Sequence, residues 1–387
     1  MLRQGTTLTL LWLSGAALRL TILVLPPLLP LIHRDLHLSE TAIGTLGSLP
    51  SLLFACAAIP GALLIARVGA RRTLVAGLFV TALGCALRGA ASDIVALDLA
   101  TIVMAAGIAV MQPALPPLAR TWMPDRVGFA TAVYSNGMVM AGLLGVALSM
   151  SVMETLAHGS WRFSLVLWAI PVAVTGVLVL LFAPRAVTTA PGVQRWWPDW
   201  RDPLVWRLGL LAGGANTVYW TANTFLPDYL VGLGRPELVA PVLTAFNGGQ
   251  IPGSLFMLVG AGALLRRKSI YAVLGLVVLA TLAGVLLGND SAIVWSAGIL
   301  GCANAVILVL ALALPALLGA PEDVHRLSAA MFTVSFPCSV LLPILGGYAW
   351  DVTGIPALAL APVALGGAVI IALARGLPAN ARDSGIS

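Results

Sequence analysis

The sequence predicts an all-α membrane protein with twelve transmembrane helices in two pseudo-symmetric six-helix bundles. Of its 387 residues 59% are hydrophobic and only 9% are charged, whereas about a quarter of the residues of a soluble domain are charged. Apolar runs of the ~20 residues that a membrane helix needs follow one another along the whole chain. One longer polar connection divides them into two sets of six. This composition excludes a water-soluble enzyme, a disordered chain and a disulfide-stapled secreted domain.

Twelve apolar runs justify the helix count. In chain order they cover about residues 8–32, 41–66, 73–91, 94–119, 129–155, 163–183, 204–230, 238–265, 270–288, 292–318, 327–350 and 355–374. Each run must be helical, because lipid offers no hydrogen-bond partner to backbone amides. Turns and charged residues lie between the runs, so every run is expected to cross the membrane once.

Lys and Arg near the ends of the runs predict that both termini are cytoplasmic. With an even number of spans the termini share one side, and that side carries sixteen Lys and Arg residues. The opposite side carries three, which are Arg34, Arg162 and Arg235. Cytoplasmic loops are enriched in Lys and Arg, so we expect a multi-pass protein of the cell inner membrane. The net charge of +6 forms no basic face, and nucleic acid is not an expected partner.

The longest polar connection sets the predicted domain boundaries. We expect an N-terminal six-helix bundle over 1–183, a cytoplasmic linker over 184–203, and a C-terminal six-helix bundle with a short cytoplasmic tail over 204–387. A weak internal repeat supports this division, since Leu29-Pro30 recurs as Leu226-Pro227 in the second half. Parallel halves of this kind are found in one large class of transporters.

The loop between the second and third runs carries a recognisable pattern, Ala62-Leu-Leu-Ile-Ala66-Arg67-Val-Gly69-Ala-Arg71-Arg72. It resembles the signature loop of the major facilitator superfamily, Gly-x-x-x-Asp-Arg-x-Gly-Arg-Arg/Lys. Arg67, Gly69 and Arg71 match this pattern, and the resemblance implies that they take part in gating. Ala62 and Ala66 replace the first Gly and the Asp, which puts the gating role attributed to that Asp in doubt.

A narrower resemblance covers most of the first half. Its pieces include Arg19 followed by Pro26-Pro27-Leu28-Leu29-Pro30, Leu38-Ser39-Glu40-Thr41-Ala42-Ile43-Gly44, Leu87-Arg88, and Tyr134 with Met138. These strings are similar to the cyanate porter family, which includes a 2-nitroimidazole transporter-like member. The resemblance implies a secondary transporter, not an enzyme, that moves a small solute by alternating access.

Arg19 is the residue that carries most of the functional prediction. It stands about eleven residues into the first run, near the middle of the bilayer, where a charge is costly and usually functional. No span carries Asp or Glu at the same depth. A guanidinium is well suited to bind an anion, so we interpret Arg19 as the anion-binding residue. The alternative is that Arg19 caps carbonyls left without partners where Pro26 and Pro27 break the helix.

The seventh run carries a polar stripe of Asn216, Tyr219, Trp220 and Asn223. This i, i+3, i+4, i+7 spacing places all four side chains on one helix face. We predict that the stripe contacts the substrate, together with Asn247 and Gln250 on the eighth run, Asn304 on the tenth and Tyr134 on the fifth. The alternative for each of them is interhelical hydrogen bonding.

The predicted function is secondary active transport of a small anion or polar weak acid, with cyanate leading. Two alternatives stay open. A multidrug or nitroimidazole efflux pump would bind neutral compounds through Trp220, Tyr219 and Trp168, with Arg19 structural. A membrane enzyme or sensor would need a catalytic cluster, and the sequence offers no nucleotide-binding loop or zinc signature. We expect no cofactor, no bound metal, and a monomer whose partners are a small-molecule substrate and the lipid bilayer.

Overall fold

The structure of the chain consists of helices. The computed structural model describes residues 2–36, 40–184, 195–265, 267 and 269–374, and in these ranges every regular element is an α-helix or a short 3-10 helix. Eleven helical segments in the described residues are long and apolar enough to cross a membrane. A twelfth long helix, α9 (Pro203–Gly232), is less apolar than these eleven segments, and with it the described residues contain twelve long helical segments. These helices coincide with the twelve apolar runs, and the predicted fold class is confirmed.

The chain divides into two compact units. The N-terminal unit comprises Met1–Trp197 and Pro321–Ala329, and the C-terminal unit comprises Pro198–Ala320 and Ala330–Ser387. Helix α13 (Val324–Thr353) therefore begins in the first unit and continues in the second. Most of the predicted linker, residues 185–194, lies outside the described residues. The predicted boundaries at 183 and 204 stay a prediction.

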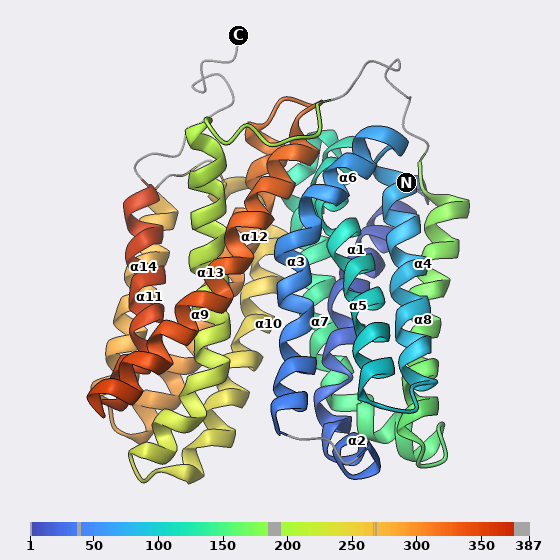
Figure 1. Cartoon of the computed structure of the whole chain (residues 1–387). Helices are drawn as coiled ribbons and strands as arrows, with labels where there is room; N and C mark the ends of the chain where they lie inside the picture. Colours follow the sequence, from blue (N-terminus) through green and yellow to red (C-terminus); the bar gives the residue numbers. More distant parts are fainter. Residues whose placement is uncertain (1, 37–39, 185–194, 266, 268, 375–387) are drawn as a thin grey trace. The chain divides into compact units, whose positions relative to one another are not determined.

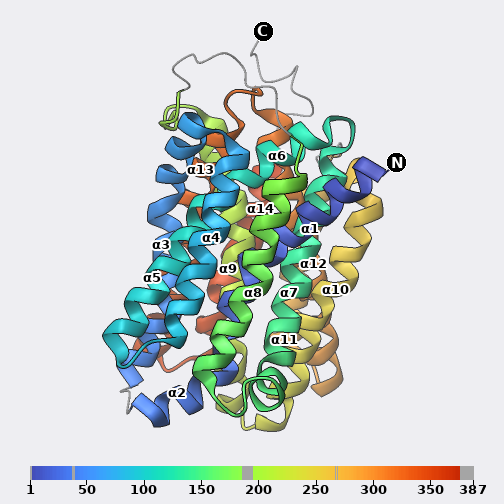
Figure 2. The same ribbon diagram turned by 90° about the vertical axis from the view of Figure 1, so that its right-hand side faces the viewer.

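In the N-terminal unit six long helices run side by side (Figures 1 and 2). They are α1 (Leu2–Leu23), α3 (Glu40–Val68), α4 (Ala70–Gly89), α5 (Ile94–Met111), α7 (Val127–Thr155) and α8 (Trp161–Phe182). Shorter elements are η1 (Pro26–Leu28) and α2 (Leu29–Leu36) after α1, and η2 (Gln112–Ala114), α6 (Leu115–Trp122) and η3 (Pro124–Arg126) after α5. Helix α1 packs most extensively against α7, whereas α4 packs against both α5 and α8.

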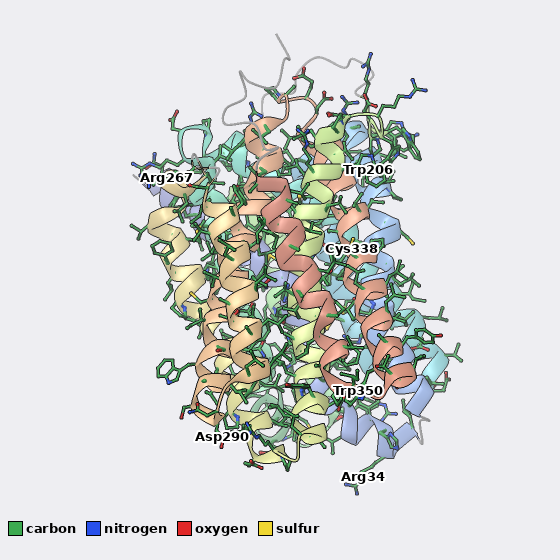
Figure 3. All side chains as sticks on the ribbon, turned by 90° about the vertical axis from the view of Figure 1, so that its left-hand side faces the viewer. Arg34, Trp206, Arg267, Asp290, Cys338 and Trp350 are labelled. Carbon is green, nitrogen blue, oxygen red and sulfur yellow. The ribbon has the colours of Figure 1, made fainter. Side chains whose placement is uncertain are left out.

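The C-terminal unit contains α9, α10 (Val239–Leu264), α11 (Ser269–Leu287), α12 (Asp290–Leu318), most of α13, and α14 (Ala361–Ala374). The short elements η4 (Pro236–Leu238) and η5 (Pro356–Leu360) precede α10 and α14. Helix α10 packs against α12, and α14 packs against α11 and α9. Figure 3 shows Trp206 and Arg267 at one end of this unit and Asp290 and Trp350 at the other, with Cys338 between them. The helices thus cross from end to end, as membrane spans must.

Side-chain caps mark where several spans begin. Asp93, Ser160, Asp202 and Asn289 each accept a hydrogen bond from a backbone N–H in the first turn of α5, α8, α9 and α12, respectively. Such caps satisfy amides that have no partner within the helix. Between α3 and α4 the chain turns at Gly69, whose φ of 89° suits glycine.

The first predicted run, 8–32, is not one continuous helix. Helix α1 ends at Leu23, and the chain continues through η1 into α2. Pro26 has no N–H to donate to the preceding turn, and the amide of Leu25 donates to the carbonyl of Ile22 at 3.3 Å in a tighter turn. The membrane-crossing segment accordingly covers Gln4–Leu28, about four residues earlier than the prediction.

Candidate functional site

Arg19 lies on α1 within the N-terminal unit. It stands three residues beyond the centre of the Gln4–Leu28 segment, about 4.5 Å along the helix axis. Its side chain is half-buried and takes part in a polar or electrostatic interaction of its own. The depth is compatible with a functional charge inside the bilayer.

The break at the end of α1 has donors from two other helices. The carbonyl of Thr21 accepts a hydrogen bond from Nη1 of Arg88 on α4 at 2.9 Å. The carbonyl of Val24 accepts one from Oγ of Ser149 on α7 at 2.7 Å. These two carbonyls are therefore capped by residues other than Arg19, which weakens the case that capping the break is the role of Arg19.

Arg88 lies inside the unit and not at the membrane surface. Its relative exposure is 0%, while its neighbour Leu87 is 43% exposed. An arginine this close to a helix end could extend to the headgroups or pair with the nearby Asp93 or Asp98, but the described residues show neither arrangement. The side chain points toward α1 and α5, where Nη1 contacts Thr21 and, at 3.1 Å, Sδ of Met104.

Two further polar side chains of this unit, those of Trp12 and Asn136, meet where α1 packs against α7. Nε1 of Trp12 donates to Oδ1 of Asn136 at 2.9 Å. A Cβ on Gly15 would lie only 1.9 Å from the carbonyl oxygen of Tyr134, so the two backbones are in direct contact there. Tyr134 itself is 2% exposed. Its predicted contact with substrate therefore requires a rearrangement that exposes this side chain.

In the C-terminal unit the predicted stripe on α9 divides between two neighbours. Nδ2 of Asn216 approaches Oγ of Ser335 on α13 at 3.5 Å, a long and weak hydrogen bond. The rings of Tyr219 and Trp220 meet edge to face with centroids 5.4 Å apart, and Phe246 on α10 lies 6.1 Å from Tyr219. The aromatic pair thus faces α10, whereas Asn216 faces α13.

Three amide side chains form a connected amide network, defined here as Asn223, Asn247 and Gln250. Nδ2 of Asn223 donates to the backbone carbonyl of Tyr219 at 2.9 Å. Nδ2 of Asn247 donates to Oδ1 of Asn223 at 2.9 Å, and Nε2 of Gln250 donates to Oδ1 of Asn247 at 3.2 Å. The network joins α9 to α10 and leaves N–H groups of Asn223 and Gln250 for a further acceptor.

Asn304 on α12 is 2% exposed, and its Oδ1 has no hydrogen-bond partner among the described residues. A buried amide oxygen of this kind is costly to leave without a donor. The predicted substrate role of Asn304 stays a prediction, as do those of the other site residues.

The signature loop makes a contact within its own unit. Nη2 of Arg71 donates to the carbonyl of Leu180 near the end of α8 at 2.6 Å. Arg67 and Gly69 are exposed at the turn. Arg71 therefore caps a helix C-terminus, where a positive charge is favourable. The gating role of the three residues stays a prediction.

Comparison with known proteins identifies the family. A model of the Major Facilitator Superfamily matches residues 11–343. The chain belongs to the Major Facilitator Superfamily. It is therefore a secondary transporter in a membrane and not an enzyme, as the sequence predicted.

Two curated relatives of this superfamily member come from Escherichia coli (strain K12). The chain is 25% identical to the cyanate transport protein CynX over 360 residues, which cover 90% of each protein. It is 30% identical to a 2-nitroimidazole transporter over 237 residues, which cover 58% of each. The predicted resemblance to these two transporters is confirmed.

A solved structure supports the fold. The crystal structure of the E. coli fucose:proton symporter FucP is similar with a TM-score of 0.70 at 18% identity, over 97% of this chain and 98% of that one. At this level of identity the similarity concerns the fold alone.

Proposed function

We propose that this transporter carries a small anion or polar weak acid of the cyanate type, and that Arg19 binds its negative charge. The observation that carries the proposal is the position of Arg19 near the middle of the apolar segment Gln4–Leu28, combined with the capping of Thr21 and Val24 by Arg88 and Ser149. A charge placed there without a function is expensive. The similarity to a cyanate transport protein over 90% of the chain supports the substrate class.

The amide network supplies neutral hydrogen bonds in this proposal. Asn247 donates to Asn223 and accepts from Gln250, so its orientation is set by both neighbours. The remaining N–H groups of Asn223 and Gln250 can donate to an anion without adding charge. Neutral donors bind an anion less tightly than a second cation would, which favours release after transport.

The proposal includes the topology. We infer a monomer in the cell inner membrane with both termini cytoplasmic, two six-helix domains at 1–183 and 204–387, and alternating access through movement of the two domains. The excess of Lys and Arg on one side supports this orientation.

The test is uptake of labelled cyanate into proteoliposomes by wild type, Arg19→Gln and Arg19→Lys. Arg126→Gln is the matched control, because Arg126 is exposed at the end of the short helix η3 in the same unit. Saturable uptake that falls at least tenfold in Arg19→Gln, recovers in part in Arg19→Lys and is unchanged in the control supports the proposal. Uptake by Arg19→Gln equal to wild type removes Arg19 from the site. If wild type takes up no cyanate at either polarity of a pH gradient, the proposed cyanate-type substrate is wrong.

A second candidate is export of nitroimidazole or other neutral aromatic compounds. The Tyr219–Trp220 pair beside Phe246 offers faces on which a flat ring can stack, and the 2-nitroimidazole transporter is a relative. Transport of 2-nitroimidazole that survives Arg19→Gln and is lost in Trp220→Ala would favour this candidate.

A further inference from the structure

Only one of the three nitrogens of the Arg88 guanidinium, Nη1, makes contacts that satisfy its N–H groups in the described residues. Nη1 donates to the carbonyl of Thr21 and contacts Sδ of Met104. Nε and Nη2 are buried, and neither has a hydrogen-bond partner among the residues that the structure describes. Two of the three nitrogens of a completely buried cation are thus left without acceptors.

These two nitrogens form one edge of the planar group. In a guanidinium, the N–H of Nε and one N–H of Nη2 point in the same direction and are spaced to meet two oxygens of one oxyanion. Nη1, which faces the other way, is held by α1 and α5 and so fixes the orientation of the plane. The side edge of Arg88, meaning Nε and Nη2, is therefore a preoriented pair of donors.

No carboxylate in the described residues takes this position. Asp93 accepts from Ala96 and Ser92 at the start of α5. The described ion pairs join Arg162 to Asp35, Arg235 to Asp290 and Arg326 to Asp323. Asp98, on the helix that supplies Met104, has an Oδ1 that is itself buried without a hydrogen-bond partner. A buried cation without a counter-charge is unfavourable, so a ligand that supplies one would bind with a strong electrostatic gain.

The surroundings of Arg88 are polar on several sides. Oγ1 of Thr21 is also buried, and no described residue forms a hydrogen bond with it. Helices α4, α5 and α8 lie together in this part of the unit (Figure 2), and Sγ of Cys85, one turn before Arg88, donates to the carbonyl of Leu165 on α8. The carbonyl of Thr21, to which Arg88 donates, lies two residues before the end of α1 and close to the break at Pro26 and Pro27.

We propose that the side edge of Arg88 is a binding site for a planar oxyanion, such as a carboxylate or nitrate, inside the N-terminal unit. Two coplanar oxygens give Nε and Nη2 one acceptor each in two parallel hydrogen bonds, whereas chloride, or the end of a linear anion such as thiocyanate, offers a single acceptor atom that both N–H groups must share, and it should bind more weakly. Because Arg88 has no exposed surface, the anion enters when the end of α1 moves at its break. The site is independent of Arg19 and does not rest on the proposed function.

The first test measures anion-dependent thermal stability of the purified full chain in detergent. Wild type, Arg88→Lys, Arg19→Gln and Met104→Leu are titrated with formate, acetate and nitrate, and with chloride and thiocyanate at matched ionic strength. Lysine keeps the charge but lacks the paired donors. We expect the oxyanions to stabilise wild type, Arg19→Gln and Met104→Leu alike, with an apparent affinity at least tenfold weaker in Arg88→Lys.

Two results would overturn the proposal. One is stabilisation by chloride and thiocyanate as strong as that by the oxyanions. The other is stabilisation that is lost in Arg19→Gln and kept in Arg88→Lys, which would assign the anion to Arg19 and leave the proposed function intact. Loss of cyanate uptake in Arg19→Gln with unchanged formate stabilisation separates the two sites.

A second measurement uses wild type alone, so it does not depend on whether a variant of Arg88 folds. Phenylglyoxal modifies accessible arginines, and peptide mapping of wild type by mass spectrometry reports each one. We expect slow labelling of Arg88 that formate suppresses at least fivefold, with labelling of exposed Arg126 unaffected. Labelling of Arg88 that formate does not change would contradict the proposal.

Discussion

The close contact of α1 with α7 makes Gly15 the most sensitive position of the N-terminal unit. A Cβ at Gly15 would lie 1.9 Å from the carbonyl oxygen of Tyr134 and 2.7 Å from its carbonyl carbon. Ordinary contacts of a Cβ begin near 3.4 Å. The substitution Gly15→Ala therefore forces the two helix backbones apart by about 1.5 Å, since neither backbone can rotate out of the way.

The expected cost follows from this displacement. Overpacking a tight interior costs about 1–3 kcal/mol, and a contact with backbone belongs to the upper end of that range. Alanine is more favourable than glycine within a helix by about 0.5–1 kcal/mol, and this gain offsets part of the cost of overpacking. We expect a net loss of about 2 kcal/mol. The separation also lengthens the bond from Trp12 to Asn136, which is 2.9 Å in the structure.

The matched control is Gly5→Ala on the same helix, where an added Cβ meets nothing within 4 Å. Unfolding of the three proteins in detergent with increasing SDS measures the difference, and uptake in proteoliposomes reports the effect on transport. We expect Gly5→Ala to be at least as stable as wild type and Gly15→Ala to be clearly less stable. Equal stability of Gly15→Ala and Gly5→Ala would refute the packing argument.

Three further predictions concern single groups. Ser149→Ala removes the donor to the carbonyl of Val24 and should lower the free energy of unfolding by about 1 kcal/mol, whereas no change would show that another group caps this carbonyl. Asn247→Asp places a negative charge in the amide network and should weaken anion uptake at least tenfold more than Asn247→Ala. For a neutral substrate the two variants should differ by less than that. The pKa of Asp93 lies below its usual range because the N–H of Ala96 and the hydroxyl of Ser92 hydrogen-bond to its carboxylate. The ionised carboxylate of Asp93 therefore stabilises the folded protein above its ordinary pKa near 3.8. This stabilisation is lost as the pH falls through the lowered pKa. The melting temperatures of wild type and Asp93→Ala should differ at pH 7 and converge as the pH falls below the lowered pKa, and a difference that does not shrink with falling pH would contradict this account.

The spans could be predicted from the sequence because their signal is local. Each apolar run is longer than a bilayer is thick, and charged or turn residues separate it from the next. The end of the first span was harder to place. The proline pair showed that the helix breaks, yet the run continues apolar to Ile32, and hydropathy alone does not distinguish a transmembrane turn from the short helix α2.

The partners of polar side chains could be predicted only in part. The spacing on α9 placed four side chains on one face, but the rotation of α9 decides that Asn223 meets Asn247 on α10 while Asn216 meets Ser335 on α13. Rotation depends on packing between helices distant in sequence. For the same reason the sequence does not show that Arg88 is buried, since its place one residue before the end of α4 is equally suited to a surface arginine. The capping role of Ser149 left no sequence signal, because serine is common in membrane helices.

The polarity of α9 has a consequence for how the protein is made. In the described residues α9 is the long helix that falls short of the apolarity of the other spans, and the amides of Asn216 and Asn223 lie well inside it. During synthesis the insertion machinery releases a segment into lipid according to its summed transfer free energy, so α9 partitions weakly by itself. Its amide partner Asn247 belongs to α10, which emerges next. Helices α9 and α10 are therefore expected to leave the translocon together as a hairpin. Insertion of the second half then depends on the hydrogen bond between Asn223 on α9 and Asn247 on α10.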